Sequence, residues 1–202
     1  MKAYKNSLST VYHVGTLDVN KLGHNKPEVY DSLEGSGLSV SQHPEEWTEI
    51  AKLGGSDVYS LTKANPNFLI ENEENKEKAI QWCVDNEFLV RKKKYRAYTS
   101  NEDGEDCYFE LDTKKQAENE SDDVRDVDGY SFGLKGQKYW KSCFSSSPNN
   151  SLAEAFAVIF YAETLGYDGV WWHEVLDISS LSAPRGVIFQ HKLCEWEVKL
   201  VK

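Results

Sequence analysis

Three short stretches of the 202-residue chain combine residue types that could perform chemistry on a small molecule. The first ends at Glu174, which follows the turn residues Asp168 and Gly169 and the apolar run 170–172. The apolar run predicts a buried strand. A carboxylate at the end of such a strand is held by the scaffold while its head faces a cleft. The alternative is that Glu174 is an ordinary loop glutamate, because most acidic residues are exposed.

The second candidate is His13, near the end of a strand predicted over residues 11–17. Gly15 follows closely, and a residue without a Cβ lets a ligand approach the backbone. The alternative is a half-buried histidine that only bonds to neighbouring backbone.

The third candidate is a pair of small hydroxyls, Ser39 and Ser41, in a stretch that begins with two glycines. Alternation along a strand places both serines on one face and Leu38 and Val40 on the other. Such hydroxyls could line a polar pocket, or they could simply face water at the edge of a sheet.

The elements that must position these residues follow from hydrophobic periodicity. The clearest is a helix over residues 152–165, with Ser151 as its predicted N-cap and an apolar stripe broad enough to be central. Gly166 is predicted to cap its C-terminus with a positive φ. Further predictions are a helix beginning near Pro44, a helical pattern over 67–86, and strands over 57–62, 186–190 and 194–201.

Composition limits the classes of protein to consider. An apolar fraction of 40% with 12% aromatic residues can form a core, and the length suits one domain with an insertion at about 71–150. A net charge of −10 argues against a protein that binds nucleic acid mainly by coating phosphates. No apolar run could span a bilayer, and the scattered cysteines fit reduced thiols in a cytoplasmic protein better than a disulfide framework or a metal site.

Three motifs in this order resemble the ADP-ribosyltransferase family of toxins and phage effectors. They are Tyr-His-Val-Gly-Thr at 12–16, Gly-Leu-Ser-Val-Ser at 37–41, and a helix leading into Leu-Gly-Tyr-Asp-Gly-Val at 165–170 with an acid soon after. The family usually has glycine directly after the histidine, whereas Val14 is inserted here. The resemblance implies that residues 1–202 form a single domain with an α+β fold. This fold would be a split β-sandwich with flanking helices and a central insertion.

The resemblance also implies roles for individual residues and NAD as a substrate. Glu174 would be the catalytic acid, and His13 would bond the NAD ribose. The nicotinamide amide would be held by the backbone of Val14, Gly15 and Thr16, while Ser39 and Ser41 would line the pocket. Trp47 and Tyr59 could stack on a ring or could belong to the core.

The activity that the resemblance implies is transfer of ADP-ribose from NAD to a macromolecule, either a protein or a nucleic acid. Two alternatives share the fold: an NAD glycohydrolase, and a binding module without activity. An antitoxin or inhibitor protein would be a second partner, and no membrane is expected. The basic run 91–96 is the predicted contact for a polyanionic target, or a solvated helix end or loop. Glu195 and Glu197 share one face of a predicted strand and are rivals of Glu174 for the catalytic role, although a solvated face explains them better.

Overall fold

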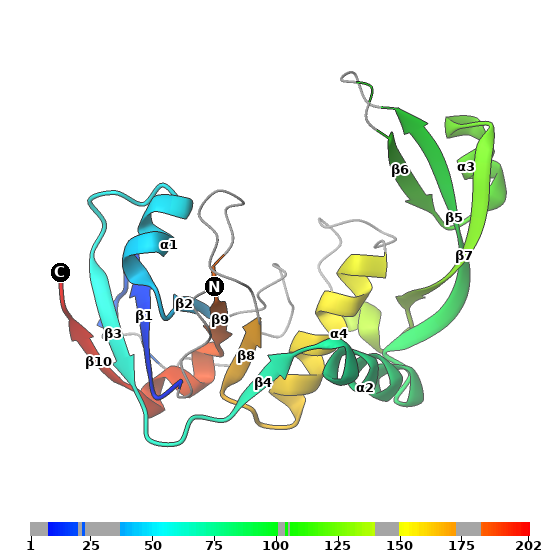
Figure 1. Ribbon diagram of the computed structural model, residues 1–202. Helices are drawn as coiled ribbons and strands as arrows, with labels where there is room; N and C mark the ends of the chain where they lie inside the picture. Colours follow the sequence, from blue (N-terminus) through cyan, green and yellow to red (C-terminus); the bar gives the residue numbers. More distant parts are fainter. Residues whose placement is uncertain are drawn as a thin grey trace. The chain divides into compact units, whose positions relative to one another are not determined.

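The computed structural model describes residues 8–19, 22, 37–100, 104, 106–139, 150–172 and 183–202. These residues form helices and strands arranged in two sheets, so the chain has a mixed α and β fold (Figure 1). The chain divides into two compact units, one of Met1–Ala79 with Val158–Lys202 and one of Ile80–Ala157. The sequence predicted one domain with an insertion at about 71–150, and the second unit covers most of that range.

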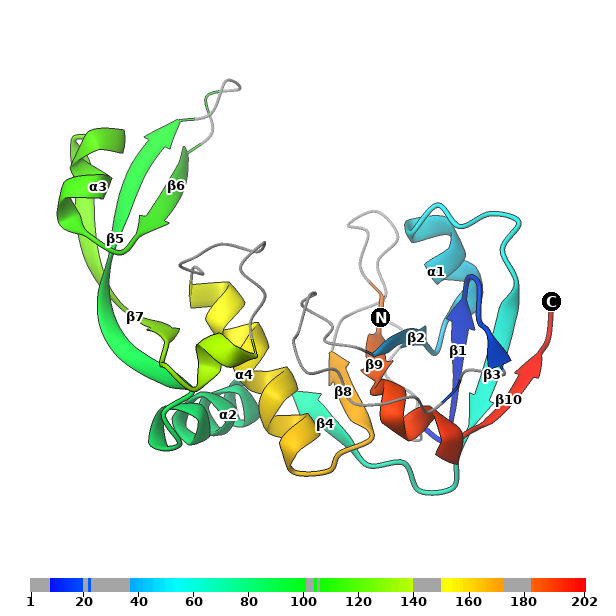
Figure 2. The same ribbon diagram turned by 180° about the vertical axis from the view of Figure 1, so that it is seen from behind.

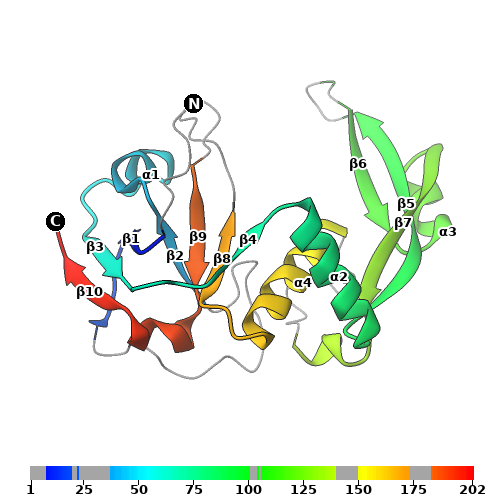
Figure 3. The same ribbon diagram turned by 60° about the horizontal axis from the view of Figure 1, so that its bottom comes forward.

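The first unit contains a seven-stranded sheet in the order β10-β3-β1-β2-β9-β8-β4. Its strands, in chain order, are β1 (Thr10–Val14), β2 (Leu38–Ser41), β3 (Val58–Thr62), β4 (Phe68–Glu71), β8 (Gly169–Trp172), β9 (Arg185–Ile188) and β10 (Glu197–Leu200). All neighbouring strands are antiparallel except β4 and β8, which are parallel. Strand β8 lies between β9 and β4, as Figure 3 shows. A short helix, α1 (Pro44–Ile50), follows β2, and a 3₁₀ helix, η4 (Gln190–Glu195), precedes β10.

The two faces of this sheet have different surroundings. Strand pairing aligns Val11 with Leu61 and Val40 with Gly186, and successive side chains alternate between faces. One face therefore carries the main hydrophobic core, whose buried members are Leu8, Val11, Val40, Leu61, Phe68, Trp171, Ile188, Leu193 and Trp196. The opposite face carries Tyr12 and Ser41, which are register partners.

Helix α4 (Asn150–Thr164) leads into β8, as the sequence predicted. Gly166 has a φ of 80° at the end of the helix, which confirms the predicted C-cap. Ser151 lies within the helix and not at its N-cap, because the helix already includes Asn150. The helix predicted over Leu152–Leu165 is thus correct in position, while the predicted capping box is wrong.

Strands β8 and β9 approach each other unusually closely at two glycines. A Cβ on Gly169 would lie 1.8 Å from the carbonyl oxygen of Val187, and a Cβ on Gly186 would lie 2.4 Å from Cε3 of Trp171. Both distances are far below van der Waals contact, so this strand pair requires glycine at both positions.

The second unit contains a three-stranded antiparallel sheet in the order β6-β5-β7. Its strands are β5 (Leu89–Ser100), β6 (Asp106–Leu111) and β7 (Asp123–Phe132), and a short helix, α3 (Lys114–Glu120), packs against the sheet (Figure 2). A 3₁₀ turn, η2 (Gly136–Lys138), follows β7. Helix α2 (Glu73–Asp85) and α4 each contribute residues to both units.

Several predicted elements differ from the structure. The helical pattern predicted over 67–86 is β4 followed by α2, and the strand predicted over 194–201 is the end of η4 followed by β10. The basic run 91–96 lies in the middle of β5 and not in a helix end or loop. In the part of the chain that the structure describes, no helix is long and apolar enough to cross a membrane.

Candidate active site around His13

His13 lies on β1, between β3 and β2 in the first unit. Its Nδ1 is 2.9 Å from the carbonyl oxygen of Ser39. A carbonyl can only accept, so Nδ1 must carry the proton and donate it. In the neutral imidazole, this tautomer leaves a lone pair on Nε2, which therefore faces its surroundings as an acceptor.

The Nε2 atom of His13 is buried and has no hydrogen-bond partner among the residues that the structure describes. Gly15 lies against it, because a Cβ on Gly15 would be 3.2 Å from Nε2. Gly15 has a φ of 141°, and its N–H donates to the carbonyl of Asp57 at 2.9 Å. The Tyr59 ring lies at a centroid distance of 6.5 Å from the imidazole. The site thus presents one acceptor nitrogen beside a bare stretch of backbone.

The neighbours of His13 in the predicted motif lie in different environments. Val14 is buried, and it is the register partner of Val58 on β3. Thr16 follows the strand and is exposed. Gly15 lies against the imidazole.

The two serine hydroxyls are not brought to His13. Strand alternation puts Ser39 and Ser41 on the face of Tyr12, whereas His13 faces the opposite side. Ser41 is buried, donates to the carbonyl of Pro184 at 2.8 Å and accepts from the N–H of His43 at 3.1 Å. Its hydroxyl therefore fixes the entry into α1, and the contribution of Ser39 to the histidine is its backbone carbonyl.

Glu174 and the adjacent His173 lie outside the described residues. Strand β8 is described up to Trp172, two positions before Glu174 in the sequence. At this end of the sheet the Arg185 guanidinium lies 5.5 Å from the ring centre of Trp47 and 5.7 Å from that of Trp172. These are cation–π distances. Sequence analysis missed Arg185, because its two aromatic neighbours come from elements far apart in the chain.

The rival acids Glu195 and Glu197 are engaged in ion pairs. Glu195 lies in η4 and not on a strand, and its carboxylate is 2.5 Å from Lys63 Nζ. The hydrogen bond from Lys63 holds the pKa of Glu195 below its ordinary value. Glu197 is exposed and lies 2.7 Å from Lys199 Nζ. The two acids do not share the predicted strand face.

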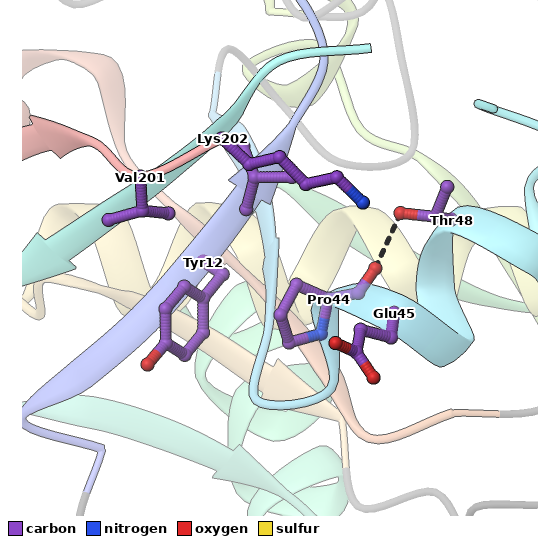
Figure 4. Close-up of a pocket in the computed structure, with 7 residues that line it drawn as sticks. Tyr12, Pro44, Glu45, Thr48, Val201 and Lys202 are labelled. Carbon is purple, nitrogen blue, oxygen red and sulfur yellow. Dashed lines mark hydrogen bonds between the residues drawn. The ribbon is translucent and has the colours of Figure 1, made fainter. Parts of the chain in front are cut away.

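A cavity of about 510 Å³ lies on the Tyr12 side of the sheet (Figure 4). Figure 4 shows Tyr12 on one side of it and residues of α1 on the other, with the hydroxyl of Thr48 donating to the carbonyl of Pro44 at 2.6 Å. Its full lining is Tyr12, Pro44, Glu45, Thr48, Val58, Val201 and Lys202. Because Tyr12 and His13 point to opposite faces, the site around His13 does not use this cavity.

The basic run on β5 is largely neutralised within the second unit. Lys93 pairs with Asp126 at 2.6 Å, Arg96 pairs with Glu110 at 3.3 Å, and the buried Lys94 pairs with Asp112. Arg91 donates to the neutral side chain of Gln81 at 2.6 Å, so three of the five cations of the run have an acidic partner in the printed ion pairs. Within the described ranges, no group of three histidine, cysteine or acidic side chains is arranged to hold a metal ion.

Comparison of the chain with protein-family models, curated proteins and solved structures finds no match.

Proposed function

We propose that the protein is a mono-ADP-ribosyltransferase that transfers ADP-ribose from NAD to a macromolecular target. The observation that carries the proposal is the unpartnered acceptor nitrogen Nε2 of His13 beside Gly15. A ribose hydroxyl is a suitable donor for this nitrogen. The resemblance of three motifs to ADP-ribosyltransferases supports the same assignment, including its split β-sandwich fold.

The reaction would break the bond between nicotinamide and the ribose and pass through an oxocarbenium-like state. A carboxylate stabilises the positive charge that develops on the sugar, as in glycoside hydrolysis. Glu174 has this role in the proposal, since it follows β8 in the sequence. A nucleophile of the target then bonds to the sugar carbon, and nicotinamide leaves with the electron pair of the broken bond.

His13 would act in this reaction by positioning the sugar. Its Nδ1–H is held by the Ser39 carbonyl, so the ring orientation is fixed before a ligand binds. With Nδ1 protonated, Nε2 can accept a hydrogen bond from the ribose. Gly15 supplies a surface without a side chain, over which a flat ring can approach the backbone.

The proposal is tested by comparing His13→Asn with His191→Asn in a nicotinamide-release assay. The amide of the introduced asparagine can replace the Nδ1 donor to Ser39 but has no counterpart of Nε2, whereas His191 belongs to η4. We expect kcat/KM for NAD to fall about a hundredfold in His13→Asn, which corresponds to about 2.7 kcal/mol, and to be unchanged in His191→Asn. Equal effects of the two substitutions would contradict the role of His13.

Labelled NAD and a cell lysate distinguish the related activities. Label that protease or nuclease removes from macromolecules identifies a transferase and the class of its target. Free ADP-ribose without labelled macromolecules identifies a glycohydrolase. Glu174→Gln should abolish whichever NAD turnover is seen, while its circular dichroism spectrum stays the same. Absence of all NAD turnover in the unmodified protein would contradict the proposal.

A further inference from the structure

The cavity beside α1 is not used by the site around His13. Its volume of about 510 Å³ falls within the range of about 300–1,000 Å³ that is typical of sites for small molecules. Its lining comes from β1, β3, α1 and the segment after β10, so the whole cavity belongs to the first unit. The chemistry of this lining decides which small molecule the cavity can hold.

The strand side of the cavity is mainly apolar. Val58 is the register partner of Val14, and Tyr12 precedes Val14 by two positions, so Tyr12 and Val58 lie on the same face of the sheet. Val201 continues this surface, because its N–H donates to the carbonyl of Val58 at 2.8 Å. The Val201 side chain is 54% exposed. A flat apolar group lying against Tyr12 would remove this apolar surface from water.

Two side chains of opposite charge also line the cavity. Glu45 comes from α1, and the side chain of Lys202 extends toward α1 (Figure 4). The backbone of Lys202 is fixed, since its carbonyl accepts the N–H of Val58 at 2.9 Å. Neither charged group has an ion pair or a side-chain hydrogen bond with a described residue, so they do not pair with each other. Both charges are therefore available to a ligand.

The hydroxyl of Thr48 adds an acceptor on the α1 side. Its proton is donated to the carbonyl of Pro44 at 2.6 Å, so its oxygen can only accept from a ligand. An ammonium group has three donors and no acceptor, and it therefore matches both the Thr48 oxygen and the Glu45 carboxylate. A carboxylate matches Lys202. A ligand with one charge would leave the other charge of the cavity without a partner, so complementarity favours a ligand that carries both.

We infer that the cavity binds an α-amino acid with a flat apolar side chain. The ammonium group of the ligand would lie toward Glu45 and Thr48, and its carboxylate toward Lys202. The ring of the ligand would contact Tyr12 in an offset or edge-to-face arrangement. This binding does not require NAD or His13, so it can be tested independently of the proposed transferase activity.

The test measures dissociation constants for the full chain by NMR titration with four small molecules. Phenylalanine carries all the expected groups, whereas phenethylamine lacks the carboxylate, 3-phenylpropionate lacks the ammonium group, and glycine lacks the ring. We expect phenylalanine to bind at least about fivefold more tightly than either analogue with a single charge. It should bind about tenfold or more tightly than glycine. No binding of phenylalanine, or equally tight binding of any one of the other three, would overturn the inference.

Protein variants assign each charge of the ligand to its partner. Glu45→Gln should weaken binding of phenylalanine and phenethylamine about fivefold and leave 3-phenylpropionate unchanged. Lys202→Gln should weaken binding of phenylalanine and 3-phenylpropionate by a similar factor and leave phenethylamine unchanged. Both residues are exposed, so the variants should fold, which circular dichroism checks.

Two exposed residues outside the cavity lining provide matched controls. Glu49 lies on the same helix as Glu45, and Lys199 lies on β10 shortly before Lys202. Glu49→Gln and Lys199→Gln should leave the affinity for all four molecules unchanged. The inference would be wrong if a control variant lost as much affinity as the variant that it matches. It would also be wrong if Glu45→Gln and Lys202→Gln each weakened the three ring-bearing molecules equally, or weakened none of them.

Discussion

At the scale of single residues, the two nitrogens of His13 have different surroundings. One is fixed by the carbonyl of Ser39, and the other lies against Gly15 without a partner among the described residues. The sequence motif indicated both the histidine and the glycine. It could not indicate which nitrogen forms a hydrogen bond, because the carbonyl that accepts this bond comes from a strand that is distant in the sequence.

Gly15→Ala tests the contact between the glycine and the imidazole. The added Cβ would lie 3.2 Å from Nε2, and the φ of 141° is unfavourable for alanine. We expect the free energy of unfolding to fall by about 1–3 kcal/mol, measured by urea denaturation. Nicotinamide release should fall as well, because the methyl group occupies the surface on which a ligand would lie.

Gly54→Ala is the matched control for this substitution. A Cβ on Gly54 has nothing within 4 Å, and Gly54 does not have a positive φ. Its free energy of unfolding should change by less than about 1 kcal/mol. If the two variants were equally stable, the conformation and packing assigned to Gly15 would be incorrect.

At the scale of elements, one ionic group connects the strands of the first unit. Lys63, directly after β3, lies 2.6 Å from Asp168, which precedes β8, and 2.5 Å from Glu195 in η4. Asp168 also accepts the N–H of Asn67, before β4, at 2.7 Å. Asp168 was predicted only as a turn residue, because its partners lie about a hundred positions away and cannot be recognised from local sequence.

Lys63→Gln should lower the free energy of unfolding by about 2 kcal/mol, since it leaves the buried Asp168 carboxylate without its cation. Burial lowers the pKa of Lys63, but its hydrogen bonds to Asp168 and Glu195 outweigh this effect and raise the pKa above 10.5. The hydrogen bond from Lys63 lowers the pKa of Glu195 below 4.5. The stability difference between the two proteins should therefore be largest between pH 4.5 and pH 10.5. It should shrink as acid protonates Glu195 and as base deprotonates Lys63.

Lys199→Gln provides the control, because Lys199 pairs with Glu197 at the surface with both side chains more than half exposed. Its effect on stability should stay within about 1 kcal/mol. A pH-independent difference between wild type and Lys63→Gln would show that the lysine acts through packing and not through its charge.

Elements differ in how far they could be predicted. Helix α4 and strands β2 and β3 were predicted because their apolar residues follow a single clear period. The boundary between β4 and α2 was missed, since the apolar triplet Phe68-Leu69-Ile70 fits a strand and a buried helix equally well. Strand β5 was missed for another reason. Its lysines indicate a segment that is exposed to solvent, but Lys94 is buried and forms an ion pair with Asp112. Long-range pairing with β6 and β7 decides the conformation of the segment.

At the scale of the whole molecule, the division into two units falls inside helices α2 and α4. The sequence predicted an insertion but not this arrangement, because neither helix changes in composition at the boundary. Cys83 on α2 is fully buried, and burial raises the pKa of its thiol to about 12. Its Sγ lies 3.9 Å from the carbonyl oxygen of Ala157 on α4.

The thiols therefore provide a measurement of local opening. Of the three cysteines that the structure describes, the exposed Cys194 should react with iodoacetamide in native buffer faster than the partly exposed Cys107. Cys83 should react only when α2 separates from α4, so its rate should rise with urea in parallel with global unfolding. Peptide mass spectrometry identifies the modified sites. Labelling of Cys83 at the rate of Cys194 would contradict the burial of this helix face.

The close approach of β8 and β9 affects how natural variation in this protein should be interpreted. Gly169 and Gly186 are required because any side chain there would overlap the opposite strand. Both should remain glycine in every relative that keeps this strand pair, whether or not that relative binds the same ligand. Constancy at His13 would have no comparable steric cause, since the ring is held by one hydrogen bond and is only partly buried. A population of related sequences would therefore reveal selection for activity at the histidine and selection for folding alone at the two glycines.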